Sequence, residues 1–403
     1  MAWLIVRYVR HRWSALVPIA LVVALGACGA FVALGAAERT ASAYARYLER
    51  SAAGDVVINP SLATSEIDAV VRDLPGVRAL TSDSLFLAAI DDRAGAPRTG
   101  AELAGGYVAQ VLGSADGRYS TMDRPVVTVG RLPSAGDEVL VNRALADARR
   151  LEVGDLLTLS FWDPADELRA EPDDVVSLVG VEQVRVAGVA TLADEVFPDR
   201  LYPAGRIIVS PELAARYDCL PDVPAAQATE EEVLEAMFPP GCARAYRYYS
   251  LDLDGGSRAV PAAVGAFLDR SIELNAELPP GLVAPEASSG TTGPALARSY
   301  FLVATTTSEE RQRVERSTYP TVVALVVLGA AAAATTVVVT ALAVARELRR
   351  AEDDLRQWRS MGLTTRSRAA VVTIPLLASA TAGLAVALVA AWVLSPVGPA
   401  GVV

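Results

Sequence analysis

Few side chains in this sequence could carry out covalent or acid–base chemistry. The single histidine, His11, stands between Arg10 and Arg12 at the edge of an apolar run, where an interfacial polar residue is the simpler interpretation. All 36 basic residues are arginine, so the sequence lacks the lysine of a Walker A loop, of a Schiff base and of S-x-x-K hydrolases. Histidine and cysteine are not clustered at metal-ligand spacing. We therefore expect neither an enzyme nor a cofactor or metal site.

The residues best suited to recognition lie in the segment ARELRRAEDDLRQWRSMGLTTRSR, residues 345–368. Leu348, Leu355 and Trp358 recur at helical spacing and form one apolar stripe. Two interpretations stay open at this point. The segment is either a charged helix lying on a membrane surface or a helix that docks a cytoplasmic partner.

The end of this helix supplies the remaining candidate contacts. Arg359 can hold an acidic group of a partner through its planar guanidinium. Gly362 is a good helix terminator, and Thr364 is a plausible cap for the next helix. On the docking interpretation, the candidate coupling residues are Leu355, Trp358, Arg359, Met361 and Gly362.

Three long uncharged runs indicate where the chain could cross a bilayer. They extend over residues 13–37, 317–345 and 369–403, and about 20 apolar helical residues span a hydrocarbon core of about 30 Å. The first run is longer than the roughly 7–15 apolar residues of a signal peptide, so we interpret it as an uncleaved anchor. We place the transmembrane helices at 14–37, 319–345 and 369–395.

Arginine placement predicts the orientation. The segment 1–13 carries three arginines and no acid, and the loop 346–368 carries 7 Arg against 4 Asp/Glu. The segment 38–318 instead carries 26 Arg against 43 Asp/Glu, a net charge of −17. Short basic segments stay in the cytoplasm. We therefore expect a multi-pass protein of the cell membrane with segments 1–13 and 346–368 in the cytoplasm, 38–318 outside, and no nucleic-acid partner.

The three cysteines divide between these compartments. Cys28 lies in the first apolar run, where it acts as a small apolar residue. Cys219 and Cys242 both lie in the exterior segment beside turn-forming residues. Disulfides persist in extracytoplasmic compartments. We therefore predict a Cys219–Cys242 disulfide; two free thiols are the alternative.

The exterior segment predicts a mixed α/β domain of two lobes. Residues 38–50 read as a helical stalk, and a strand, a helix capped by Thr64 or Ser65 and a second strand follow over 54–90. From 125 to 210 short Val-rich strands alternate with turns, interrupted by a helix that ends at Gly154. A Pro/Gly/Ser linker at 278–294 precedes a helix over 295–318 that leads into the second span.

Several of these segments together resemble the FtsX/MacB-like permeases, the type VII membrane subunits of ABC transporters. That family typically carries R-E…L-R-A-L-G-A-T-R-R after its second span, and this chain has Arg346-Glu347 followed by WRSMGLTTR at 358–366. The exterior segments LPGV (74–77), GRLPSAGDEVLVNRALADARRLEVGDLLTL (130–159) and VRVAGVA (184–190) are also similar to the family.

The resemblance implies an α+β membrane protein: transmembrane helices and a large two-lobed α/β extracytoplasmic domain, MacB-like, on helical stalks. It implies a permease subunit that couples ATP hydrolysis by a separate ATPase to movement of the exterior domain, paired with a second permease copy or homologous half. The alternative is a membrane-anchored sensor or binding module, or an FtsX-like regulator of cell-wall hydrolases that does not transport. An adjacent ATPase gene would favour the permease.

One departure from the family concerns the C-terminus. The family usually has a fourth span, whereas this sequence ends in SPVGPAGVV after the third apolar run. We interpret residues 396–403 as an extracytoplasmic end and expect the natural gene to continue past Val403.

Overall fold

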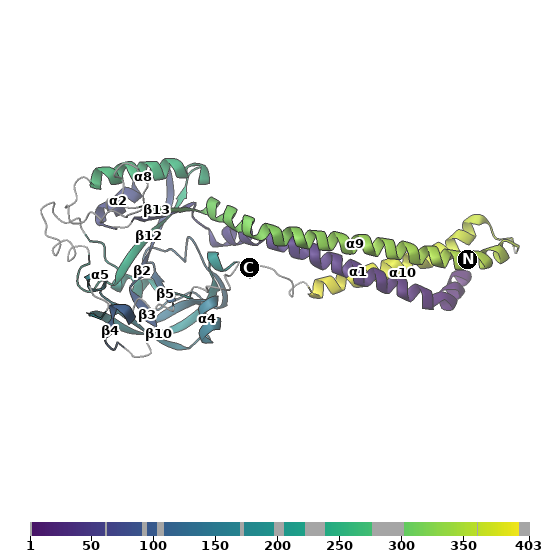
Figure 1. Cartoon of the computed structure of the whole chain (residues 1–403), viewed down its shortest axis with the longest axis horizontal. Coiled ribbons are helices and arrows are strands. Elements are labelled where there is room, and N and C mark those ends of the chain that lie inside the picture. Colours follow the sequence, from purple (N-terminus) through teal and green to yellow (C-terminus); the bar gives the residue numbers. More distant parts are fainter. Residues whose placement is uncertain are drawn as a thin grey trace. The chain divides into compact units, whose positions relative to one another are not determined.

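The computed structural model describes residues 2–60, 63–90, 95–102, 109–169, 173–196, 205–221, 238–275, 302–360 and 362–394. The chain divides into two compact units. One, here called the helical unit, comprises residues 1–43 and 315–401. The other, here called the sheet domain, comprises residues 44–314. Figure 1 shows a bundle of long helices in the first and a strand-rich fold in the second.

Three long helices build the helical unit: α1 (Ala2–Ser51), α9 (Thr307–Ser360) and α10 (Thr365–Leu394). Each contains a stretch long and apolar enough to cross a membrane, with a mean hydropathy of 2.5, 2.6 and 2.1 respectively. These stretches coincide with the three uncharged runs of the sequence. The chain therefore has the helices of a membrane protein joined to a large domain of mixed helix and sheet.

Small residues let these helices approach closely. A Cβ added to Gly26 of α1 would lie 1.9 Å from Oγ1 of Thr336 on α9, and one added to Gly383 of α10 would lie 2.4 Å from the carbonyl oxygen of Ala20 on α1. The hydroxyl of Ser379 also donates to the carbonyl oxygen of Leu16. Helix α1 thus packs against both partners through positions that admit no larger side chain.

The sheet domain is organised by one sheet of 11 strands among its described residues. Its path is β13-β1-β12-β2-β5-β11-β7-β10-β8-β3, and β6 pairs with β10. The strands are β1 (Val56–Pro60), β2 (Val77–Phe86), β3 (Ala88–Ile90), β5 (Ala109–Gly113), β6 (Val126–Gly130), β7 (Glu138–Asn142), β8 (Leu156–Trp162), β10 (Leu178–Thr191), β11 (Gly205–Val209), β12 (Arg244–Leu253) and β13 (Leu302–Thr306). A separate two-stranded sheet pairs β4 (Arg98–Thr99) with β9 (Val175–Val176).

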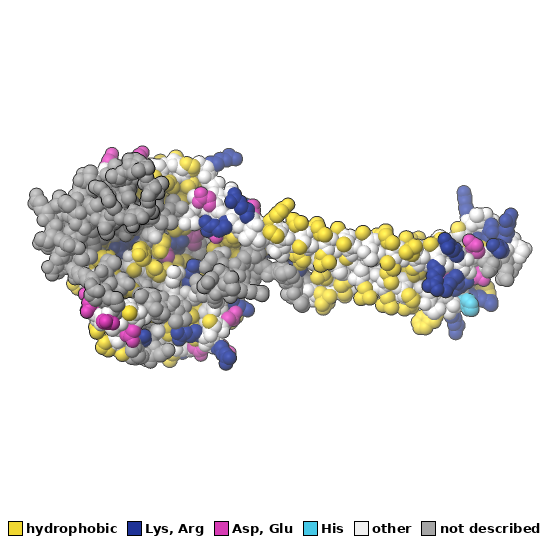
Figure 2. Space-filling view, viewed as in Figure 1, with side chains coloured by type: hydrophobic (Ala, Val, Ile, Leu, Met, Phe, Trp, Pro, Cys, Tyr) yellow, Lys and Arg dark blue, Asp and Glu magenta, His cyan; other side chains and the backbone are white. Residues whose placement is uncertain are grey.

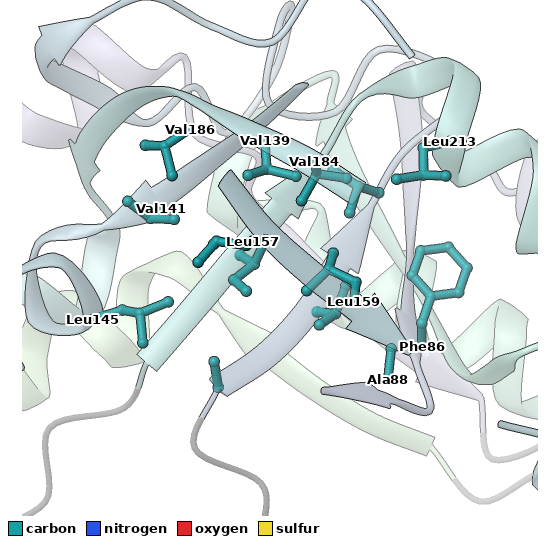
Figure 3. Close-up of a cluster of buried hydrophobic side chains, with 14 of the residues drawn as sticks. Phe86, Ala88, Val139, Val141, Leu145, Leu157, Leu159, Val184, Val186 and Leu213 are labelled. Atoms are coloured by element: carbon teal, nitrogen blue, oxygen red, sulfur yellow. The ribbon is translucent and has the colours of Figure 1, made fainter. Parts of the chain in front are cut away.

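Helices cover this sheet in two places and define two hydrophobic cores. The first core gathers alternate residues of β7, β8 and β10, as the close-up in Figure 3 shows. The second core joins β1 and β12 to the helices α2 (Ser65–Arg72) and α8 (Val260–Asn275), which lie together in Figure 1. The shorter helices are α4 (Arg143–Arg149), α5 (Pro164–Arg169) and α6 (Pro211–Tyr217). The expected strand–helix–strand and β-rich regions thus share a single sheet.

Several local predictions agree with the structure and others are wrong. The hydroxyl of Thr64, not that of Ser65, caps α2 by accepting from the Ile67 N–H at 3.3 Å. The helix over 295–318 is wrong in part, because Leu302–Thr306 forms strand β13 on β1 and α9 begins at Thr307. Residues 295–301 and the linker at 278–294 lie outside the described residues.

Two further predictions failed at strand and helix ends. Helix α4 stops at Arg149, because Arg150 adopts a left-handed conformation (φ 56°) several residues before Gly154. The segment 175–190, where we expected short strands separated by a turn, is largely one strand, β10, which runs 14 residues to Thr191. Gly180 and Gly188 lie inside that strand at register shifts rather than in turns between strands.

The structure joins Cys219 and Cys242 by a disulfide, with Cα atoms 5.7 Å apart. Cys219 follows α6, and Cys242 precedes β12. The bond closes a loop over a sequence separation of 23 residues. It therefore links the end of α6 to the start of β12, whose residues Tyr249, Leu251 and Leu253 belong to the second core.

Candidate functional site

A tight turn at Gly362–Thr364 joins α9 to α10; we call this turn the elbow. Gly362 has φ 83°, which suits glycine, and its N–H donates to the carbonyl oxygen of Arg359 at 3.1 Å. The N–H of Leu363 donates to the carbonyl oxygen of Trp358 at 3.2 Å. This pair of bonds is a Schellman motif. The Thr364 hydroxyl then accepts from the Ser367 N–H at 3.3 Å, so the predicted terminator and cap are both present.

One arginine of α1, Arg12, holds the end of α9 through ion pairs and a hydrogen bond. The two Nη atoms of Arg12 lie 3.1 Å from Oε1 of Glu347 and 2.8 Å from Oδ2 of Asp354. The same guanidinium donates to the backbone carbonyl of Arg350 at 3.2 Å. The Glu347 side chain is 3% exposed and that of Arg12 is 20% exposed. A nearly buried carboxylate is therefore paired with a cation from another helix, and the Tyr8 hydroxyl also donates to its Oε1 at 3.5 Å.

Aromatic packing reinforces this contact. The rings of Tyr8 and Trp358 meet edge to face with centroids 6.2 Å apart. Trp358 and Leu355 are partly buried against a cluster that includes Leu16, Ala351 and Leu376.

The candidate coupling residues therefore lie in different surroundings. Leu355 and Trp358 pack against the chain's own helices, so only part of each remains for a partner. Arg359 is exposed at the elbow and Gly362 forms the turn. Met361 lies outside the described residues. The sequence singled out Glu347 through the Arg346-Glu347 pair that resembles the family, but it did not predict the contacts of Tyr8 and Arg12 with it; the spacing of Glu347 and Asp354, seven residues apart on one helical face, was a further signal.

Positive charge gathers at this end of the helical unit, as Figure 2 shows, while the rest of the helices is mostly apolar. A groove of ≈ 630 Å³ opens there beside the Arg12 contacts. It is lined by Trp3, Leu4, Arg7, Tyr8, Arg10, His11, Arg12, Asp354 and Trp358. The groove thus combines arginines with aromatic rings at the end of the apolar helices.

A second helix end, the C-terminus of α1, is held inside the sheet domain. The N–H groups of Asp123 and Arg124 donate to the carbonyl oxygens of Ala52 and Ser51 at 3.2 and 2.7 Å. The guanidinium of Arg124 donates to the carbonyl oxygen of Arg50 at 3.1 Å. The last carbonyls of the helix, which have no partner within it, are satisfied by this segment. We call residues 114–124 the collar.

Buried charges fasten the collar to the sheet. Arg118 pairs with Asp83 of β2 and with Asp123, whose other oxygen accepts from the Gly54 N–H at 3.0 Å. The Tyr119 hydroxyl donates to Oδ2 of Asp83 at 2.6 Å. Tyr119 and Asp123 both have positive φ, 71° and 50°. Such a backbone costs on the order of 1–3 kcal/mol per residue and persists only where its surroundings fix it.

A cavity of ≈ 220 Å³ lies beside the collar within the sheet domain. Polar lining comes from Arg118, Tyr119, Arg206 and Glu310, and apolar lining from Leu112 and Leu192. Among the residues that the structure describes, no group of three His, Cys, Asp or Glu side chains could hold a metal ion. The cavity thus combines charged and apolar side chains.

Comparison with known proteins gives little more. The chain matches no known protein-family model and no curated protein. Among solved structures it is similar to a domain of a protein described as a permease from Porphyromonas gingivalis. That match has 11% identity and a TM-score of 0.29, and it covers 55% of this chain and 83% of the other. A TM-score this low does not establish a shared fold.

Proposed function

We propose that the chain is the permease subunit of an ABC transporter of the FtsX/MacB-like type. A separate cytoplasmic ATPase binds the elbow between α9 and α10. Its movement passes along α9 and α1 to the extracytoplasmic sheet domain, which exports or extracts a substrate. The observation that carries the proposal is the elbow itself, a capped helix–turn–helix at the basic end of three membrane-length helices.

The form of the elbow supports contact with another protein. Its turn is fixed by backbone hydrogen bonds, so the elbow can bear load without a partner to order it. Arg359 remains exposed on it. An exposed arginine on a fixed turn is well suited to an acidic partner surface. In this proposal segments 1–13 and 346–368 are cytoplasmic, because their arginine excess favours that side.

The two long helices support transmission. Helix α9 is a single helix of 54 residues from Thr307 to Ser360, and α1 is one of 50 residues. At 1.5 Å per residue each is about 75–80 Å long, more than twice the hydrocarbon thickness of a bilayer. Each helix runs from one unit into the other. The collar gives α1 a firm end in the sheet domain.

A second candidate function is an exterior binding or sensor module without transport, including an FtsX-like regulator of cell-wall hydrolases. The cavity beside the collar favours it, because a ligand there would touch both Arg118 and the residues that begin α9. This function requires no ATPase.

Arg359→Ala tests the elbow, with Arg350→Ala as its control. Both arginines are exposed. They are nine residues apart, which is two and a half helical turns, so they lie on opposite sides of α9. The measurement is co-purification of an ATPase with the chain from native membranes, followed by ATP hydrolysis of the complex. We expect Arg359→Ala to lose most of the ATPase and Arg350→Ala to retain it.

The other outcomes decide against the proposal. If both variants retain the ATPase with full activity, the elbow is not its docking site. If the wild-type chain brings no ATPase with it, the binding or sensor module is the better function.

A further inference from the structure

The groove at the basic end contains two arginines, Arg7 and Arg10, whose charges are not paired within the described part of the helical unit. Among the described residues, neither Arg7 nor Arg10 has an acidic partner within ion-pair distance. Asp354, the acid of the groove, is already paired with Arg12. The groove therefore presents uncompensated positive charge.

An aromatic ring holds one of these guanidinium groups. The Cζ atom of Arg7 lies 5.3 Å from the centre of the Trp3 ring, and Trp3 is 66% exposed. Stacking on an aromatic face orients a guanidinium while leaving its N–H groups free to donate. Planar, oriented donors of this kind suit the oxygens of a phosphate.

The same face of α1 continues as an exposed apolar stripe. At 100° per residue, Trp3, Arg7 and Arg10 share a face with Val17, Leu21 and Leu25. These last three side chains are 44%, 55% and 75% exposed. One helical face thus carries a basic head followed by an apolar strip, which matches the order of groups in a phospholipid.

We propose that this groove binds the headgroup of an anionic phospholipid. Arg7 and Arg10 would hold its phosphate, and an acyl chain would lie along Val17, Leu21 and Leu25. The inference rests on the proposed membrane embedding of α1, and it adds a ligand that this function does not specify. Anionic lipids attract basic juxtamembrane residues on the cytoplasmic side.

The apolar strip decides between a lipid and other occupants. A free phosphate would use the two arginines but not Val17, Leu21 and Leu25. An acidic surface of a protein would lie in water and would likewise stop at the groove. A molecule with both a charged head and an apolar tail matches the whole face.

The experiment uses the full chain in phosphatidylcholine vesicles with spin-labelled phosphatidylglycerol or phosphatidylcholine as probes. The measured quantity is the preference of the protein for the labelled phosphatidylglycerol. The variant Arg7→Gln/Arg10→Gln removes both phosphate contacts. The matched control, Arg346→Gln/Arg349→Gln, removes the same charge at the same spacing from an exposed part of α9.

We expect the first variant to lose preference by about 25-fold, since each of its two basic residues near a membrane surface contributes roughly fivefold. The control should change it less than about twofold, and Arg7→Lys/Arg10→Lys should retain most of it. An equal loss in both glutamine variants would show a general charge effect and overturn the site. Unchanged preference in Arg7→Gln/Arg10→Gln would overturn it too.

Further measurements separate the remaining occupants. Inorganic phosphate at constant ionic strength should not displace the labelled lipid; displacement would assign the groove to a free anion. ATPase co-purification with Arg7→Gln/Arg10→Gln should remain intact. Loss of the ATPase with lipid preference retained would make the groove a protein site instead. Trp3→Ala, which keeps all charges, should still weaken the preference by about threefold, as expected for a stacked cation.

Discussion

Two helix ends in this chain are fixed by different kinds of interaction. The end of α9 makes its own glycine turn and is held to α1 by the side chain of Arg12. The end of α1 is capped by backbone N–H groups of the collar, which is fastened by the ion pair of Arg118 with Asp83. The first end leaves Arg359 exposed on the surface, whereas the ion pair that holds the second, between Arg118 and Asp83, is nearly buried.

This difference fits the two roles in the proposed function. A surface that meets another protein benefits from accessible, oriented charges. A joint that transmits movement into a domain benefits from closely packed, fully bonded groups that cannot yield separately. If the comparison is correct, changes in the collar should affect folding strongly, and changes at the elbow should affect it less.

The largest expected effect comes from Arg118→Ala. The side chains of Arg118 and Asp83 are 11% and 3% exposed, so the substitution leaves a buried carboxylate without its cation. We expect a loss of about 3–5 kcal/mol in the free energy of unfolding of the sheet domain. Urea denaturation in detergent measures it, with the fluorescence of buried Trp162 as the probe.

Arg131→Ala is the control for this measurement. Arg131 also pairs with an acidic residue, Glu138, but the Arg131 side chain is 56% exposed. Its removal should change the unfolding midpoint little. If Arg118→Ala and Arg131→Ala lost similar free energies of unfolding, burial would not explain the contribution of the Arg118 ion pair.

Arg12→Ala should have the next largest effect. It leaves the nearly buried Glu347 without its cation, but the Tyr8 hydroxyl still donates to it at 3.5 Å and the 20% exposure of Arg12 admits some solvent. We expect a loss of about 2 kcal/mol, below that of the collar. Spin labels on α1 and α9 should show their ends separating, whereas Arg10→Ala should leave the distance unchanged. An unchanged distance in Arg12→Ala would show that the ion pairs of Arg12 do not hold the end of α9 against α1.

The elbow could be predicted from sequence and the collar could not. Gly362 and Thr364 act on neighbours within a few residues, so their roles follow from local rules for helix ends. The apolar runs of the three long helices follow equally from local composition.

The collar depends on contacts between distant segments. Asp83 and Arg118 are 35 residues apart, and Asp123 meets Ala52 across a longer interval. No local pattern marks such pairs. Strand β13 was missed for the same reason: Leu302–Thr306 is β-branched enough for a strand, but its partner β1 lies about 250 residues earlier. The inward packing of Trp358 likewise depends on Tyr8 of another helix.

Gly362→Ala tests the part of the elbow that does not depend on charge. An alanine at φ 83° is strained by about 1–2 kcal/mol, although no atom lies within 4 Å of the added Cβ. We expect partial opening of the turn, measured as faster hydrogen exchange at Gly362–Thr364. Gly265→Ala lies in α8 with equally open space and no positive φ, so it should stabilise its helix slightly. Unchanged or slower hydrogen exchange at Gly362–Thr364 in Gly362→Ala would contradict the Schellman turn.

The smallest effect concerns an exposed pair in the sheet domain and its pH dependence. Hydrogen bonds from Arg131 and from the backbone of Ser134 and Ala135 lower the pKa of Glu138 from 4.5 to about 2. A lowered pKa in the folded state stabilises the fold above the unfolded pKa, and this contribution disappears as pH falls toward the folded value. We therefore expect wild type to be slightly more stable than Glu138→Gln at pH 7, with the gap closing between about pH 5 and pH 2. Urea midpoints followed by Trp162 fluorescence measure this gap. A gap that stayed constant down to pH 2 would show that the bonds of Glu138 do not depend on its charge. The contrast in stability between this pair and the buried pair of the collar would then not follow from charge and exposure.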